Sequence, residues 1–265
     1  MSRADKSRGY YDRVHYSPEK VPDSIPGKVA LSDPWYQLIL ELLARNRIEV
    51  RGRRVLEVGC GLGGLCLRFA AEGAAVTGVD FSRSALRSAS RLVPKNEPEG
   101  QSVRYAVANA KRLPFADRSF DVVICAETLE HTFAVEACLR ELRRVCADGG
   151  FVVITVPNSI AALPLGLLVH ALRLDQPQVL LSYFKLRRLI KRVGFRSVDE
   201  FGTNFFRDMI LNDVLPESWR RLARKLSERA GRRMRRSSYL WRVTAGTLGF
   251  LLQKGRMSRH RHQSS

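Results

Sequence analysis

The sequence lacks a long uninterrupted apolar run, a Cys-x-x-Cys pair and a secretory leader. The apolar segment 239–252 is interrupted by Arg242 and is shorter than the ~20 residues that span a bilayer. This excludes a membrane-spanning helix there. The five cysteines lie inside apolar segments, so we expect free thiols and a reducing, cytoplasmic compartment.

Acidic residues are almost absent from the C-terminal part of the chain. The net charge is +19, and from Trp219 onward there are 14 Lys or Arg residues and one acid, Glu228. Apolar residues recur there at helical spacing, which predicts a basic amphipathic helix. Three interpretations stay open: a helix on an anionic membrane surface, a nucleic-acid contact, or a helix packed on the protein with its charged face in water.

Residues 54–64 and 76–80 together predict a ligand site. An apolar strand ends in a glycine-rich turn that runs into a helix, and Asp80 stands at the tip of the next strand, where a carboxylate binds a ribose diol. Gly59, Gly61 and Gly64 also fit the dinucleotide pattern of nicotinamide enzymes. Glu57, however, would repel a pyrophosphate and favours a cationic, phosphate-free ligand such as S-adenosylmethionine.

Three further segments carry a family resemblance. They are Asn109–Phe115, which ends in Leu-Pro-Phe, then Ser119–Cys125 and Ala126–His131. With the glycine turn, they resemble the class I S-adenosylmethionine-dependent methyltransferases over residues 50–202. Residues 73–82 and the spacing Glu127-x-x-Glu130-His131 are similar, more weakly, to the ubiquinone-biosynthesis O-methyltransferases.

The order of elements predicts an α/β fold with a doubly wound, Rossmann-like sheet flanked by helices. Strands are expected at 54–58, 75–79, 103–106, 120–125 and 151–156, and again at 195–201 after a helix that ends at Gly194. We expect three parts: an N-terminal arm or lid (1–33), the cofactor-binding domain (34–202) and a basic, helical C-terminal extension (203–265). An apolar cap insertion (157–182) interrupts the domain and suggests a lipophilic acceptor. A helix buried against the domain would have the same apolar sequence.

The resemblance assigns cofactor roles to seven residues. For the methionine end of S-adenosylmethionine these are Glu57, Gly59, Gly61 and Gly63, for the ribose Asp80, and for the adenine Phe81 and Asn109. The family usually has an acid where this chain has Asn109. Its amide oxygen could accept the adenine amino group instead, or it could simply cap a loop.

Glu127, Glu130 and His131 are the candidate catalytic residues. At spacings i, i+3 and i+4 they would share one face of a helix. The ubiquinone-type resemblance implies a divalent metal such as Mg²⁺ on this trio, which would bind a catechol and acidify its hydroxyl. Without a metal, His131 alone could act as general base, and the structural alternative is that these residues cap or pack a helix.

We therefore expect S-adenosylmethionine-dependent O-methylation of a small or lipophilic acceptor, such as a quinone precursor, a lipid or a secondary metabolite. The alternatives are a nucleic-acid methyltransferase guided by the basic extension, a cofactor-binding homologue without catalysis, and a nicotinamide oxidoreductase. An Asn-Pro-Pro-Tyr sequence, which positions base amino groups, is absent.

Overall fold

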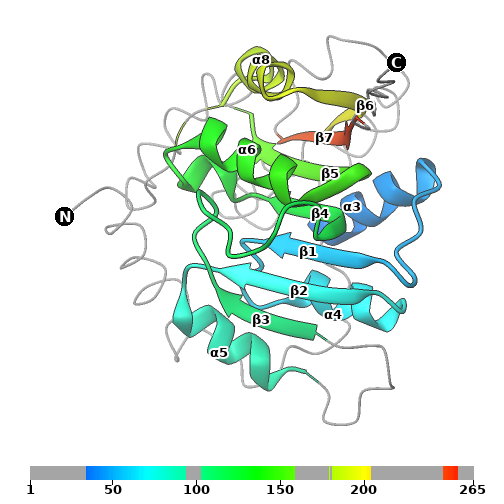
Figure 1. Ribbon diagram of the computed structural model, residues 1–265, viewed down its shortest axis with the longest axis vertical. Helices are drawn as coiled ribbons and strands as arrows, with labels where there is room; N and C mark the ends of the chain where they lie inside the picture. Colours follow the sequence, from blue (N-terminus) through cyan, green and yellow to red (C-terminus); the bar gives the residue numbers. More distant parts are fainter. Residues whose placement is uncertain (1–33, 94–102, 159–178, 180, 204–246, 256–265) are drawn as a thin grey trace, which may run out of the picture.

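The fold is built on one mixed sheet, shown in Figure 1. A computed structural model describes residues 34–93, 103–158, 179, 181–203 and 247–255. Seven strands of this part of the chain lie in the order β3-β2-β1-β4-β5-β7-β6. Their bounds are β1 Arg54–Val58, β2 Ala75–Asp80, β3 Val103–Val107, β4 Phe120–Ala126, β5 Cys146–Pro157, β6 Phe195–Thr203 and β7 Thr247–Lys254.

The first five strands run parallel, and their carboxyl ends meet at one edge of the sheet. Strand β1 pairs with β2 on one side and with β4 on the other. The order in which strands are added to the sheet therefore reverses at β1. In open α/β sheets, ligands bind outside the carboxyl ends of the strands at this point. The five strands expected before residue 158 are confirmed, as is the Rossmann-like class.

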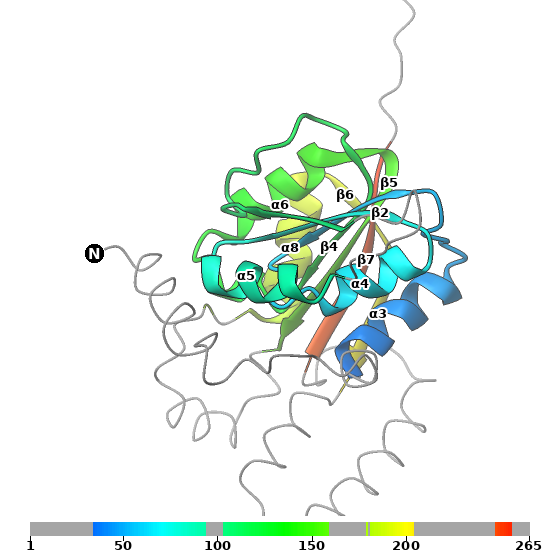
Figure 2. The same ribbon diagram turned by 90° about the horizontal axis from the view of Figure 1, so that it is seen from below.

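Helices cover both faces of the sheet (Figure 2). One core cluster joins the sheet to α3 and α4, and the other joins it to α6 and α8. The Ser82 and Ser182 side chains cap α5 and α8, each by accepting a backbone N–H bond. The helices are α3 Pro34–Arg45, α4 Gly64–Ala71, α5 Arg83–Arg91, α6 Val135–Val145 and α8 Tyr183–Val193, with the 3₁₀ turn η2 at Leu129–His131.

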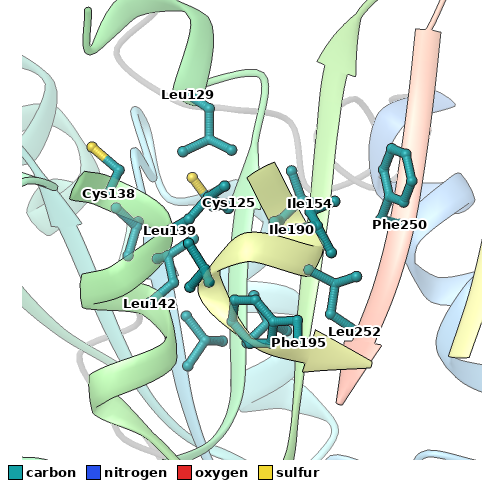
Figure 3. Packing of buried hydrophobic residues seen from close by; sticks show 14 of the residues in the cluster. Cys125, Leu129, Cys138, Leu139, Leu142, Ile154, Ile190, Phe195, Phe250 and Leu252 are labelled. Carbon is teal, nitrogen blue, oxygen red and sulfur yellow. The ribbon is translucent and has the colours of Figure 1, made fainter. Parts of the chain in front are cut away.

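Figure 3 shows the core beneath α6 and α8. Leu139 and Leu142 of α6 and Ile190 of α8 pack with Ile154 of β5 and Phe250 of β7, and all of these side chains are buried. This packing fixes β4 and β5, so the loops at their carboxyl ends start from a rigid base.

Strand β7 corrects the expected domain boundary. The sequence predicts a helical extension for residues 247–254, but they form a strand that pairs antiparallel with β5 on one side and with the edge strand β6 on the other. The run Leu248–Leu252 is buried, and its length suits a core strand as well as an interfacial helix. The sheet therefore extends to Lys254, and residues 204–246, which contain 10 of the 13 arginines after residue 203, connect two paired strands.

The remaining expected segments lie largely outside the described residues: the arm at 1–33, most of the cap at 157–182, the helix at 219–236 and the end at 256–265. In the described part of the chain, no helix combines the length and the apolarity needed to cross a membrane. All five cysteines are free and buried, which confirms the expected free thiols.

Candidate S-adenosylmethionine site and acceptor edge

Asp80 ties the glycine turn to the end of β2. Its Oδ2 accepts the Gly61 backbone N–H at 3.0 Å, and its Oδ1 accepts the Ser82 N–H at 2.9 Å. The residue is only 5% exposed. A carboxylate at a strand tip presents two oxygens at the spacing of a vicinal diol. The carboxylate is thus held in place for a vicinal diol, with the partly buried Phe81 beside it.

The three glycines assigned to the cofactor all have positive φ, namely +76° at Gly59, +53° at Gly61 and +73° at Gly63. A Cβ added to Gly59 would lie 2.1 Å from Oγ1 of Thr128, and one added to Gly63 would lie 2.0 Å from the hydroxyl of Tyr105. Close packing against these two side chains therefore requires glycine at both positions. For Gly63 this is a structural reason that needs no ligand.

Glu57 is a buried carboxyl, 4% exposed, at the end of β1. Burial raises its pKa to about 8, although the Cys66 thiol donates a hydrogen bond of 2.8 Å to Oε2 and opposes the shift. A carboxyl held neutral by burial becomes a strong partner once a cation lies beside it. Glu57 thus fits the ammonium or sulfonium of the expected cofactor.

Asn109 lies on the loop after β3 and is exposed. Its Oδ1 accepts the Lys111 backbone N–H at 3.0 Å, and its own carbonyl accepts the Arg112 N–H at 2.9 Å. The side chain therefore caps the loop, as the structural alternative required. Its contact with adenine stays a prediction.

Glu127, Glu130 and His131 do not share a helix face, which corrects the expected arrangement. Glu127 has φ +46°, a left-handed conformation that interrupts any helix, and only Leu129–His131 form a 3₁₀ turn. Among the described residues, no three His, Cys, Asp or Glu side chains are arranged to hold a metal ion. The expected Mg²⁺ site therefore has no support from the described side chains.

The two glutamates nevertheless lie together. Burial raises the pKa of both, and the charge of Glu127 raises that of Glu130 further. His131 Nε2 lies 3.6 Å from Oε1 of Glu130. Glu130 is 2% exposed, whereas the His131 side chain keeps 16% of its surface accessible.

Several buried oxygens at this edge have no hydrogen-bond partner in the described structure. They are Oε1 of Glu127, Oε2 of Glu130, and the hydroxyl oxygens of Thr155 and Thr247. Thr155 stands on β5 opposite the end of β4, and its carbonyl accepts the Glu127 N–H at 2.9 Å. Buried polar atoms are nearly always hydrogen-bonded in native proteins, so this group points to a ligand.

Three residues of this region were missed by the sequence analysis: Cys66, Thr128 and Thr155. Each acts through a contact between segments far apart in the sequence, such as Thr128 against Gly59. No local pattern signals such contacts. The spacing of Glu57 and Cys66 across the strand-to-helix turn was the one available hint.

The comparisons with known proteins agree with this geometry. Residues 56–154 match the family model described as a methyltransferase domain. The O-methyltransferase rstn1 of Aspergillus nomiae is 32% identical over 153 residues, which are 57% of this chain and 68% of that protein. A ubiquinone biosynthesis O-methyltransferase of Alkalilimnicola ehrlichii is 35% identical over 122 residues, 46% of this chain and 48% of that protein. For several curated relatives, the chain spans about half of the relative's length.

Among solved structures, phosphoethanolamine N-methyltransferase 2 of Haemonchus contortus, in complex with S-adenosyl-L-methionine, has a TM-score of 0.68. The match covers 97% of this chain and 60% of that one, at 20% identity. At this identity the likeness establishes the shared fold alone.

Proposed function

Because this chain belongs to the S-adenosylmethionine-dependent methyltransferase family, we propose that it methylates an oxygen atom of a small or lipophilic acceptor. The observation that carries the proposal is the pair Glu57 and Asp80, two buried carboxyls on neighbouring strand ends, with the glycine turn hydrogen-bonded to Asp80. The relatives at 32–35% identity that are named O-methyltransferases favour oxygen as the methylated atom.

The cofactor-binding residues act by holding S-adenosylmethionine and aligning its methyl group with the acceptor. When bound, S-adenosylmethionine supplies a methyl group that its sulfonium charge already activates. Asp80 would accept the ribose hydroxyls, and Glu57 would face the positive charge of the methionine end. Fixing methyl carbon and nucleophile in line provides much of the acceleration in such a displacement.

His131 is the proposed general base. With S-adenosylmethionine bound, the acceptor oxygen would take its methyl group and S-adenosylhomocysteine would leave, while His131 would accept the hydroxyl proton. Oε1 of Glu130, 3.6 Å from Nε2, would then stabilise the imidazolium. The partial exposure of His131 beside the buried Glu130 supports this division of roles.

A lipophilic acceptor is supported by where two segments leave the sheet. The apolar insertion begins after Pro157, and the basic insertion is bounded by Thr203 and Thr247; these three residues lie side by side in register. Both segments therefore start at the acceptor edge. We propose that the arginines of residues 219–236 contact an anionic membrane surface that presents or receives the acceptor.

Titration calorimetry with S-adenosylhomocysteine tests the cofactor assignment first. Micromolar binding supports it, whereas no binding overturns the enzymatic proposal, and a melting shift with NAD instead would indicate an oxidoreductase. Product mass spectrometry after incubation with phenols, hydroxylated lipids and amines then tests turnover and identifies the methylated atom. Cofactor binding without any product would favour a non-catalytic homologue.

Sedimentation with anionic and neutral vesicles tests the membrane proposal. Replacing Arg232, Arg233, Arg235 and Arg236 with glutamine should abolish binding to anionic vesicles without affecting S-adenosylhomocysteine affinity. This substitution leaves β7 in place, which a C-terminal deletion from residue 219 would not. Binding to RNA that weakens steeply with salt, with no vesicle binding, would instead support a nucleic-acid partner.

A further inference from the structure

The acceptor edge contains two carboxyl groups with buried oxygens that the cofactor assignment leaves unused. Glu57 and Asp80 are accounted for by the methionine end and the ribose, but Glu127 and Glu130 are not. Glu130 Oε1 faces His131, which leaves Oε2 without a partner, and Oε1 of Glu127 is likewise unpartnered. No Lys or Arg side chain of the described chain forms an ion pair with either glutamate.

A third buried acceptor atom lies beside this pair. Thr155 is fully buried, and hydrogen bonding from its hydroxyl opposes the rise in the pKa of Glu127, while the lone pairs of Oγ1 accept no hydrogen bond from the described residues. The Glu127 carboxyl thus already has a hydroxyl donor in Thr155. Burial keeps both carboxyls protonated, so a cation placed beside them would favour their ionised form and would be bound by the resulting charge.

The conformation of Glu127 is an independent sign of a functional position. Its φ of +46° is unusual for a glutamate, and such strained residues cluster at active sites and ligand clamps. The hydrogen bond from the Glu127 N–H to the Thr155 carbonyl holds this conformation at the end of β4. The chain thereby keeps the two carboxyls close together, each with one buried oxygen that lacks a partner among the described residues.

The position of the pair relative to the cofactor is also defined. Thr128, between the two glutamates, lies against Gly59 of the cofactor turn. On the other side, the Glu130 carbonyl accepts the Val179 N–H at 2.7 Å, where the chain returns from the apolar insertion. The glutamates therefore lie between the cofactor turn and the insertion expected to cover the acceptor.

We propose that Glu127 and Glu130 form a subsite for a positively charged amine on the acceptor. An ammonium group has three donors and no acceptor atom, and it matches the three unpartnered oxygens of Glu127, Glu130 and Thr155. The amine anchors the acceptor, while His131, on the accessible side of Glu130, faces the atom to be methylated. This inference rests on the proposed function, because it assigns the acceptor side of the same site.

Calorimetry on the full chain saturated with S-adenosylhomocysteine tests the subsite. The probes are benzylamine, its neutral counterpart benzyl alcohol, catechol and Mg²⁺. We expect benzylamine to bind at least tenfold more tightly than benzyl alcohol or catechol. Glu130→Gln, which removes the charge and keeps the shape, should weaken benzylamine binding at least tenfold.

Glu136→Gln is the matched control, because Glu136 lies outside this edge, on α6, and pairs with Arg140 and Arg192. It should leave benzylamine binding unchanged. Equal binding of benzylamine and benzyl alcohol, tighter binding of catechol, or Mg²⁺ binding that Glu130→Gln abolishes would each overturn the amine subsite. The probe selectivity of the unaltered protein decides the matter even if the variant fails to fold.

Melting temperature gives a second readout. Without a ligand and at neutral pH, Glu130→Gln should leave the melting temperature almost unchanged, because burial keeps Glu130 protonated and the amide has the same shape; a marked drop would mean that Glu130 has a structural role and would contradict the proposal. Failure to bind S-adenosylhomocysteine would reject the methyltransferase function itself. Normal cofactor binding without amine selectivity would reject the subsite alone.

Discussion

The two halves of the ligand-binding edge differ in how complete they are. In the cofactor half, formed by β1 and β2, the Asp80 carboxylate accepts two backbone N–H bonds, and Glu57 Oε2 accepts a hydrogen bond from the Cys66 thiol. In the acceptor half, at the ends of β4 and β5, Glu127, Glu130 and Thr155 have buried oxygens without partners. The carboxylates of the first half are fixed by hydrogen bonds within the chain, whereas the second half has buried oxygens that the described residues leave without partners.

The halves also differ in how the chain builds them. The cofactor half comes from one continuous stretch, residues 54–109, and a single βαβ pattern describes it. The acceptor half needs β4, β5 and a return segment near Val179, supported by β7 from almost the end of the chain. Cofactor use could therefore be read from local motifs, while acceptor choice depends on contacts between distant segments.

Removing β7 should have the largest effect. A chain that ends at Gly246 loses four buried residues, Leu248, Phe250, Leu251 and Leu252, each of which contributes about 2 kcal/mol. Their sum is comparable to the whole stability of a typical domain. We expect no cooperative unfolding transition by circular dichroism, whereas a chain ending at Gly255 should fold. A folded, cofactor-binding protein without β7 would show that the cofactor half is independent of the acceptor half.

Gly59→Ala tests the contact between the halves. The new Cβ would meet Oγ1 of Thr128, and the positive φ adds strain, so we expect a loss of about 4 kcal/mol in the free energy of unfolding. Gly52→Ala is the matched control, because Gly52 has φ +70° and no atom within 4 Å of the added Cβ. It should cost only about 1 kcal/mol in urea unfolding.

The double variant Gly59→Ala with Thr128→Ala should recover part of the lost stability, since it removes the clashing side chain. Equal losses in Gly59→Ala and Gly52→Ala would mean that only backbone strain matters and that Thr128 does not press on the cofactor turn.

Asp80→Ala tests the completeness of the cofactor half. It removes the proposed charge-assisted bonds to the ribose and releases the Gly61 N–H, so the affinity for S-adenosylhomocysteine should fall about a hundredfold, or ~3 kcal/mol. Asp121→Ala is the control, because Asp121 pairs with Arg54 at the opposite edge of the sheet. Unchanged affinity of Asp80→Ala in calorimetry would refute the ribose assignment.

Glu57→Gln should have the smallest effect, and this effect is on how stability and cofactor affinity depend on pH. Burial raises the Glu57 pKa to about 8, so the ligand-free protein keeps a proton that the unfolded chain releases above its ordinary pKa of 4.5. The contribution of this group to stability is thus complete below pH 4.5 and declines as the pH rises toward 8. Binding of a cationic cofactor should expel the proton, so affinity should rise by up to tenfold per pH unit below 8.

Calorimetry of S-adenosylmethionine in buffers of different ionisation enthalpy measures this proton release. The unaltered protein should release up to one proton at pH 7 more than Glu57→Gln does. The same proton release in both proteins would show that Glu57 does not face the cofactor's charge.

The sequence was sufficient for the sheet up to residue 158 and for the cofactor turn, because apolar runs and glycines at a strand end are local signals. Strand β7 was missed because a short apolar run after an arginine-rich segment fits a strand or a helix equally well. The spacing of Glu127, Glu130 and His131 suggested a helix face, but the left-handed Glu127 broke it. Such a conformation depends on tertiary contacts, which no spacing reveals.

The late position of β7 also has a consequence for folding kinetics. Lys254 Nζ donates to the carbonyl of Cys146, a contact between residues 108 positions apart, and β7 fills the place between β5 and β6. Contacts of such sequence separation form slowly because a large loop must close first. Until then β5 and β6 each have an open edge that can pair with another chain. Aggregation during refolding should therefore begin at these two strands, and a chaperone that shields them would raise the yield.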